Sequence, residues 1–185
     1  AVAASNSSGT WTATYTLVVG AINASSRNVS VTATDNAGNS KTQADSSNAT
    51  VDNVVPAVTS VSVPANATYI TGQSLDFTVN TSEAITVGGT PRIALTLGAS
   101  TVYASYLSGT GSSALTFRYT VQSGDLDTDG IAIAGSIEAN GGTLKESSGN
   151  SLSSTLNAVG STSSVLVDAI APTVSSVAVP AGDTY

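Results

Sequence analysis

The sequence predicts an all-β fold built from β-sandwich repeats in tandem. Apolar residues alternate with period two in short runs bounded by Gly, Asn, Asp and Ser, and no stretch keeps a helical period. The segment VDNVVPAVTSVSVPANATY at 51–69 also recurs as VDAIAPTVSSVAVPAGDTY at 167–185, 116 residues later and with 11 of 19 positions identical. Self-similarity at a fixed spacing is the mark of a repeat architecture.

Two further pairs of segments support the repeat. WTATYTLVVG at 11–20 parallels LTFRYTVQSG at 115–124, and DNAGN at 35–39 parallels ESSGN at 146–150, in the same order. The chain then divides into the C-terminal part of one repeat (1–52), one complete repeat (53–168) and the opening strand of a third (169–185). We therefore expect this chain to be a window of a longer tandem array.

The complete repeat is expected to contain about eight short strands, and about 116 residues of short strands and turns is typical of a β-sandwich. The runs that predict strands are Val58–Val63, Leu75–Val79, Ile85–Val87, Ile93–Leu97, YASYL, Leu115–Val121, Ile131–Ile137 and Val165–Val167. Pro56 and Pro172 follow the Val-Asp pair that closes each repeat, and proline there stiffens the connection between repeats.

The composition excludes several classes of function. The 185 residues contain no Cys, His or Met, only 9% charged residues, and 30 Ser with 26 Thr. Disulfide frameworks, zinc sites of the usual kind and Ser-His-Asp or Cys-His catalysis are excluded, so we expect no enzyme. The net charge of −7 argues against nucleic acid as a partner, and no apolar run is long enough to insert into a membrane.

Asp125, Asp127, Asp129 and Gly130 form D-x-D-x-D-G, the spacing with which alternating carboxylates and a glycine turn bind Ca²⁺. The twelfth loop position, which is Glu in an EF-hand, is Ser136 here, so the loop would sit on a β scaffold. Asp168 follows the last strand at the same pole of the sandwich. We expect a junctional Ca²⁺ site of Asp125, Asp127, Asp129 and Asp168, with an unoccupied acidic turn as the alternative.

The first repeat provides an internal comparison. Aligning Tyr15 with Tyr119 places Ala21, Asn23 and Ser25 opposite the three aspartates, so that copy lacks the acids. Asp52 occupies the upstream junction, as a cation ligand or as a turn cap.

The turns Asp35–Asn39 and Glu146–Asn150 are expected to be side-chain-bonded turns with a left-handed glycine, with a second cation site as the alternative. Trp11 is expected to pack in a core. Six Asn-x-Ser/Thr sequons, at Asn6, Asn23, Asn28, Asn48, Asn66 and Asn80, exceed chance only slightly in so Ser/Thr-rich a chain.

The DNAGN turn, the VDNVVPAV and VDAIAPTV junctions, and GDLDTDGIAI followed by NGGTLKESSGN resemble the tandem immunoglobulin-like repeats of very large secreted bacterial surface proteins and adhesins. The resemblance covers nearly the whole chain, although 1–52 is too short for a complete domain. It implies an extracellular, cell-surface spacer, often stiffened by calcium, that holds an adhesive domain away from the cell in adhesion and biofilm formation. Its partners would be neighbouring repeats, and any glycan or host-surface ligand would be bound by other domains.

Three other functions remain to be weighed. A calcium-dependent carbohydrate-binding module would use the acidic loop, but the complete repeat has no Trp as a sugar platform. A carboxylate-pair glycosidase is disfavoured because the three aspartates are too close in sequence for the separated pair that such catalysis needs. A fibre assembled by head-to-tail β-strand complementation would use the partial repeats at the two ends, although about 47 residues of the 116-residue period would be missing.

Overall fold

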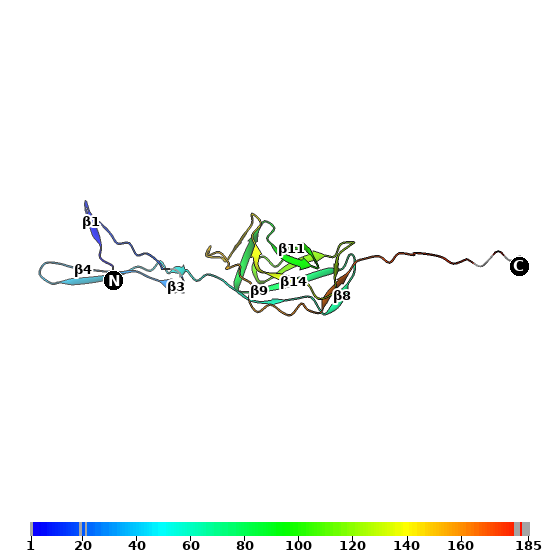
Figure 1. Cartoon of the computed structure of the whole chain (residues 1–185). Helices are drawn as coiled ribbons and strands as arrows, with labels where there is room; N and C mark the ends of the chain where they lie inside the picture. Colours follow the sequence, from blue (N-terminus) through cyan, green and yellow to red (C-terminus); the bar gives the residue numbers. More distant parts are fainter. Residues whose placement is uncertain (1, 19, 21, 180–181, 183–185) are drawn as a thin grey trace.

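The computed structural model describes residues 2–18, 20, 22–179 and 182. Within them the fold is all-β, with no helix and several sheets, an arrangement consistent with a β-sandwich. Figure 1 shows a central body with the N-terminal strands at one end and the C-terminal segment leaving from the other.

The central body contains a seven-stranded sheet and a three-stranded sheet. The larger sheet runs in the order β14 (Ala132–Glu138), β10 (Arg92–Leu97), β11 (Ser100–Ser108), β12 (Ser112–Thr120), β9 (Ser74–Gly88) and β15 (Thr143–Lys145), with β7 (Val58–Ser62) also paired to β9. The smaller sheet is β13 (Leu126–Asp127), β16 (Val165–Asp168) and β8 (Ala67–Tyr69). All pairs are antiparallel except β16 with β8.

The predicted alternation builds the core. Leu75, Phe77 and Val79 of β9 are fully buried, and β12 brings Phe117 directly opposite Phe77 and Leu115 opposite Val79. Because successive side chains of a strand point to opposite faces, these residues all enter one core while Asp76 and Thr78 face outward. The two strands expected over Leu75–Val79 and Ile85–Val87 are one continuous 15-residue strand, β9.

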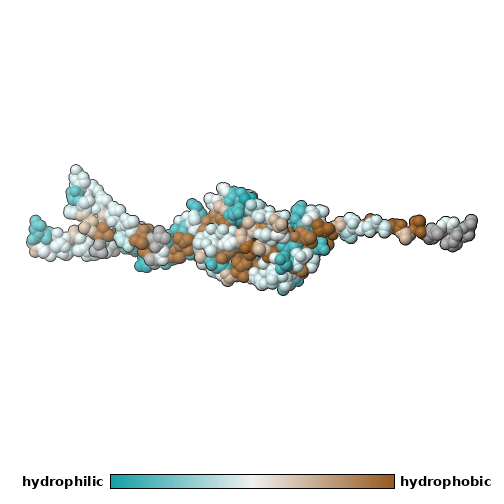
Figure 2. All heavy atoms as spheres, viewed as in Figure 1, coloured by the Kyte–Doolittle hydropathy of each residue, from teal (hydrophilic) through white to brown (hydrophobic). Residues whose placement is uncertain are grey.

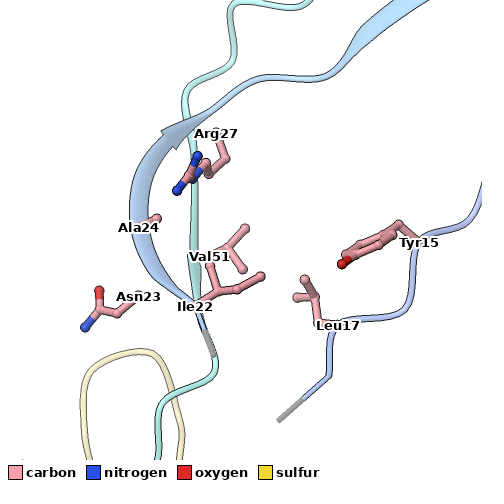
Figure 3. A pocket seen from close by; sticks show the side chains of 7 residues that line it. All are labelled: Tyr15, Leu17, Ile22, Asn23, Ala24, Arg27 and Val51. Carbon is pink, nitrogen blue, oxygen red and sulfur yellow. The ribbon is translucent and has the colours of Figure 1, made fainter. Parts of the chain in front are cut away.

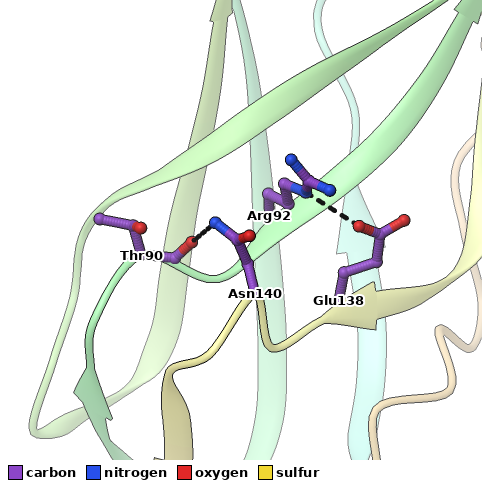
Figure 4. Close-up of polar contacts among 4 residues, drawn as sticks. All are labelled: Thr90, Arg92, Glu138 and Asn140. Atoms are coloured by element: carbon purple, nitrogen blue, oxygen red, sulfur yellow. Dashed lines mark hydrogen bonds and ion pairs between the residues drawn. The ribbon is translucent and has the colours of Figure 1, made fainter.

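Polar contacts support the outer face of the sheet. Arg92 of β10 pairs with Glu138 of β14 at 2.8 Å, and its guanidinium lies 3.7 Å from the ring centre of Tyr103 on β11. Asn140, in the turn after β14, donates its side-chain amide to the carbonyl of Thr90 (Figure 4). These contacts tie three neighbouring strands together at the surface.

The described residues of the first 52 form three two-stranded ribbons, and nearly all of these residues are exposed. They pair β1 (Ser5–Ser7) with β2 (Thr10–Thr12), β3 (Asn23–Arg27) with β6 (Ala49–Asp52), and β4 (Ser30–Thr34) with β5 (Ser40–Ala44). The segment after Asp168 forms no strand within its described residues, and Val174, Val177 and Val179 are 84%, 78% and 80% exposed. Figure 2 shows hydrophobic colour along this segment, outside any packed body.

Candidate functional site

The predicted acidic loop lies beside the end of β16, as the sequence indicates. Leu126 of β13 pairs with Asp168, and Asp127 pairs with Val167. The loop and the junction residue Asp168 are therefore neighbours at the pole from which the C-terminal segment leaves.

The carboxylates of this loop are used mainly as acceptors for nearby hydrogen bonds. Asp127 is 4% exposed, and its two oxygens accept the backbone N–H groups of Gly98 at 2.7 Å and Gly130 at 2.8 Å. Asp125 Oδ2 accepts the Tyr119 hydroxyl at 2.6 Å and the Gln122 N–H at 2.7 Å. Burial and the hydrogen bond to Asp125 together raise the pKa of Tyr119 above its ordinary value.

The predicted Ca²⁺ set does not fit an ion well in this arrangement. Asp168 accepts the N–H of Ile170, Asp129 is exposed, and no three of the four predicted carboxylates gather in the part of the chain that the structure describes. An ion would have to displace the bonds that Asp125 and Asp127 already accept. Ca²⁺ binding by this loop stays a prediction, and the observed role of Asp125 and Asp127 is to hold the turn closed.

The pairing of β3 with β6 shows that the sequence alignment between the loop of the first copy and the acidic loop is displaced by one residue. Ala24 pairs with Val51 as Asp127 pairs with Val167, so the counterpart of Asp127 is Ala24 and not Asn23. The counterpart of Asp129 then becomes Ser26 instead of Ser25. Ala21, which the sequence alignment places opposite Asp125, lies outside the described residues, and by the same shift the counterpart of Asp125 is Ile22. The first copy still closes this loop without carboxylates.

Three other carboxylates gather at the upstream junction. Asp52 ends β6, Glu83 lies in the middle of β9, and Glu146 opens the turn after β15; oxygens of all three lie within 4.8 Å of one another. Two oxygens that bind one Ca²⁺ ion each lie about 2.4 Å from it, so they can be at most about 4.8 Å from each other. Within the described residues this is the group whose geometry could hold a cation.

The electrostatics of these three groups differ because their hydrogen bonds differ. Burial raises the pKa of Glu83 above its ordinary value, and the neighbouring charges of Asp52 and Glu146 add to the increase. The pKa of Glu146 is lowered, first by the backbone N–H of Ser148 and then by the N–H and side-chain amide of Asn150. Glu83 is therefore the member of the group that bears the unrelieved like-charge repulsion.

The same junction is hydrogen-bonded across its two sides. Asn150 donates its side-chain amide to the backbone carbonyl of Asp52 at 3.2 Å, and the Ser148 hydroxyl donates to Asp52 Oδ2 at 3.3 Å. Asp52 Oδ1 also accepts the N–H of Val54 at 3.1 Å, which is the predicted turn-capping role. On the other side, Asn53 accepts the N–H of Ile22 at its side-chain oxygen, at 2.8 Å.

The two D/E-x-x-G-N turns have the predicted structure. In each, the acidic side chain accepts the backbone N–H and the side-chain amide of the Asn four residues later. Gly38 and Gly149 adopt φ values of 92° and 99°, in the left-handed region that favours glycine. The predicted turn is confirmed. Glu146 also belongs to the acidic group at the junction, so the second cation site, which was the alternative for this turn, stays open there.

A cleft of about 450 Å³ opens in the N-terminal part. It is lined by Tyr15, Leu17, Ile22, Asn23, Ala24, Arg27 and Val51, and Figure 3 shows Tyr15 and Leu17 facing Ile22 and Val51 across it. Trp11 is 70% exposed, so its expected core position is wrong. The reason is that its counterpart Leu115 is covered by β9, and the described residues of the first copy contain no such strand.

No protein-family model, curated protein or solved structure shows significant similarity to this chain. Among the residues described here, no helix is long and apolar enough to cross a membrane.

Proposed function

We propose that this chain is a non-catalytic structural spacer from a large extracellular bacterial adhesin or surface fibre, built of immunoglobulin-like repeats. The observation that carries the proposal is the junction around Asp52. Only residues 53–57 separate β6 from β7, and this short connection is hydrogen-bonded to both sides. A connection held in this way transmits orientation from one unit to the next, as a spacer requires, whereas a flexible Gly/Ser linker would not.

Further contacts fix the connection to the central body. The carbonyl of Pro56 accepts the N–H of Ser153 at 2.9 Å, and the N–H of Ala57 donates to the Ser82 hydroxyl at 3.0 Å. Pro56 is itself buried and restricts its own φ. The polypeptide between the two units therefore has few free torsions.

Ca²⁺ is part of the proposal as a stiffening ion. Two sites compete for it: the predicted loop with Asp168, and the group of Asp52, Glu83 and Glu146. The second is favoured because its oxygens already lie close together and Glu83 carries no hydrogen bond to its carboxylate among the described residues. An ion there would replace like-charge repulsion across the junction with shared coordination.

Calcium-dependent carbohydrate binding is less well supported. The exposed Trp11 lies in the N-terminal part, while the acidic loop lies at the opposite pole of the central body, so the two do not form one site (Figure 1). Binding to a glycan array that EDTA abolishes would restore this alternative.

Small-angle X-ray scattering of the whole chain tests the spacer proposal. A rod-like particle whose dimensions are unchanged between low and moderate salt is expected, because the junction is held by hydrogen bonds and not by long-range charge. A scattering curve that requires many differently bent conformers would contradict the proposal.

A further inference from the structure

The outer face of the large sheet carries a row of polar side chains that crosses five neighbouring strands. Each member pairs with the next in the register of the sheet, in the order Glu138 of β14, Arg92 of β10, Ser105 of β11, Arg118 of β12 and Asp76 of β9. Two of the three cations between residues 53 and 168 lie in this row. The positive charge of the complete repeat is therefore concentrated at one place on the sheet.

Each arginine of the row is held by an acid on its outer side. Arg118 donates from Nε and Nη2 to the two carboxylate oxygens of Asp76, both at 2.7 Å. Arg92 donates from Nε to Glu138 at 2.8 Å (Figure 4). A guanidinium has five N–H donors, so these ion pairs orient both arginines and leave most of their donors for another partner.

The middle of the row is the position that favours a negative charge. Ser105 is exposed and lies between the two arginines. Neighbouring strands are about 4.8 Å apart, so the arginine positions lie one strand spacing from Ser105 and the acid positions lie two. Because Coulomb energy falls with distance, the nearer cations outweigh the more distant acids at this point. An anion is attracted there although the protein as a whole carries a net charge of −7.

An aromatic ring adjoins this position. Tyr103 lies two residues before Ser105 on β11, on the same face, and is 37% exposed. The guanidinium of Arg92 lies 3.7 Å from the centre of its ring. The next outward residues of β12 are Thr116 and Thr120. The face thus combines an aromatic ring for the apolar side of a sugar, hydroxyls for its hydroxyls and guanidiniums for a carboxylate.

This face favours a sugar chain over a polypeptide. An extended peptide adds to a sheet at its edge, whereas the three middle strands of the row, β10, β11 and β12, are already paired on both sides. A protein interface is built around an apolar core, but the outward residues beside the row on β9 and β12 are Ser74, Thr78, Thr116 and Thr120. Hydroxyls on a flat face match the hydrogen-bonding groups of a carbohydrate instead.

We propose that the outer face at Arg92, Ser105 and Arg118 binds a uronic acid of an acidic polysaccharide, with the sugar carboxylate between the two guanidiniums and the ring beside Tyr103. Binding needs no Ca²⁺, because the guanidiniums supply the positive charge. The site is separate from the acidic loop and from the group around Asp52. This inference goes beyond the spacer function and does not depend on it.

NMR titration of the full chain with tetragalacturonate, an oligosaccharide of four uronic acids, tests the proposal in the presence of EDTA. We expect saturable shifts of the backbone amide signals of β10, β11 and β12 around Ser105, which salt weakens and which a neutral tetrasaccharide does not cause. The absence of saturable shifts would overturn the proposal and leave the spacer function intact. A tetraglutamate peptide that binds the same residues as tightly would overturn the assignment to a sugar.

A pair of substitutions that remove the same charge makes the test specific. Arg118→Gln should weaken binding about tenfold, the effect of losing one hydrogen bond to a charged group. Lys145→Gln, on β15 outside the row, should leave the affinity nearly unchanged. Equal weakening by the two substitutions would show general charge attraction and contradict a site at the row.

A third substitution tests the ring. Tyr103→Leu keeps both arginines and should weaken binding of tetragalacturonate severalfold, because the sugar loses its aromatic contact. An unchanged affinity would contradict the placement of the sugar beside Tyr103.

Discussion

Asn150 donates its side-chain amide to the backbone carbonyl of Asp52, although 98 positions separate the two residues in the sequence. Asn150 is itself held by Glu146, which accepts both its backbone N–H and its side-chain amide at 2.8 Å. The Glu146–Asn150 turn, which follows β15, is therefore hydrogen-bonded to the end of β6. This one turn links the two sides of the junction.

Replacing Glu83 with Gln should stabilise the protein at neutral pH. The folded-state pKa of Glu83 is raised, so its charged form costs stability above that pKa, and the cost disappears as pH falls through it. Gln removes the charge at every pH. The thermal midpoint of Glu83→Gln should exceed that of the native protein at pH 7, and the difference should vanish at acidic pH.

Glu138→Gln is the matched control for that substitution. Glu138 is paired with Arg92, so its removal should lower the midpoint slightly at pH 7, by the small amount typical of exposed ion pairs. Equal effects of the two substitutions would show that the repulsion at Glu83 has been misjudged.

Ca²⁺ should raise the thermal midpoint of the whole chain, because an ion that binds only the folded state stabilises it. If the junction group binds the ion, Glu83→Gln should abolish the Ca²⁺-dependent increase and Asp129→Asn should leave it intact. The opposite pattern would assign the ion to the predicted loop. No increase with the native chain would remove Ca²⁺ from the account.

Asp127 should matter for stability whether or not Ca²⁺ is present. Ala at this position leaves the N–H groups of Gly98 and Gly130 without their acceptors in a nearly buried site, at a cost of about 3 kcal/mol. Urea unfolding in EDTA measures it. Asp129→Ala, at an exposed position in the same loop, should change the unfolding free energy little, and a comparable loss there would contradict the assigned role of Asp127.

The sequence predicts the strands well and the site less well, for a physical reason. Alternation identifies Leu75, Phe77 and Val79 as core because burial on one face of a strand is a local pattern. Strands of two or three residues, such as β8 and β13, have no such pattern and are missed.

For the acidic residues, the sequence predicts the position of the loop but not the contacts of its carboxylates. The D-x-D-x-D-G spacing correctly locates a tight loop next to Asp168, but spacing does not reveal that Asp125 and Asp127 bond to backbone and tyrosine donors. Glu83 lies on β9 and Glu146 lies in the turn after β15, so their proximity to Asp52 depends on the tertiary fold. Two signals were available in the sequence: the position of Asp52 at the upstream junction, and the cation site considered as the alternative for the Glu146–Asn150 turn.

The distance distribution between two spin labels across the junction tests the central claim, a junction of fixed orientation, most directly. The chain has no cysteine, so Lys41→Cys on β5 and Thr101→Cys on β11, both exposed, give two unique labelling sites. We expect one narrow distribution, which Asn150→Ala broadens and which Asn39→Ala, in the equivalent turn that does not contact the junction, leaves narrow. A broad distribution in the native chain, or no difference between the two variants, would contradict the account.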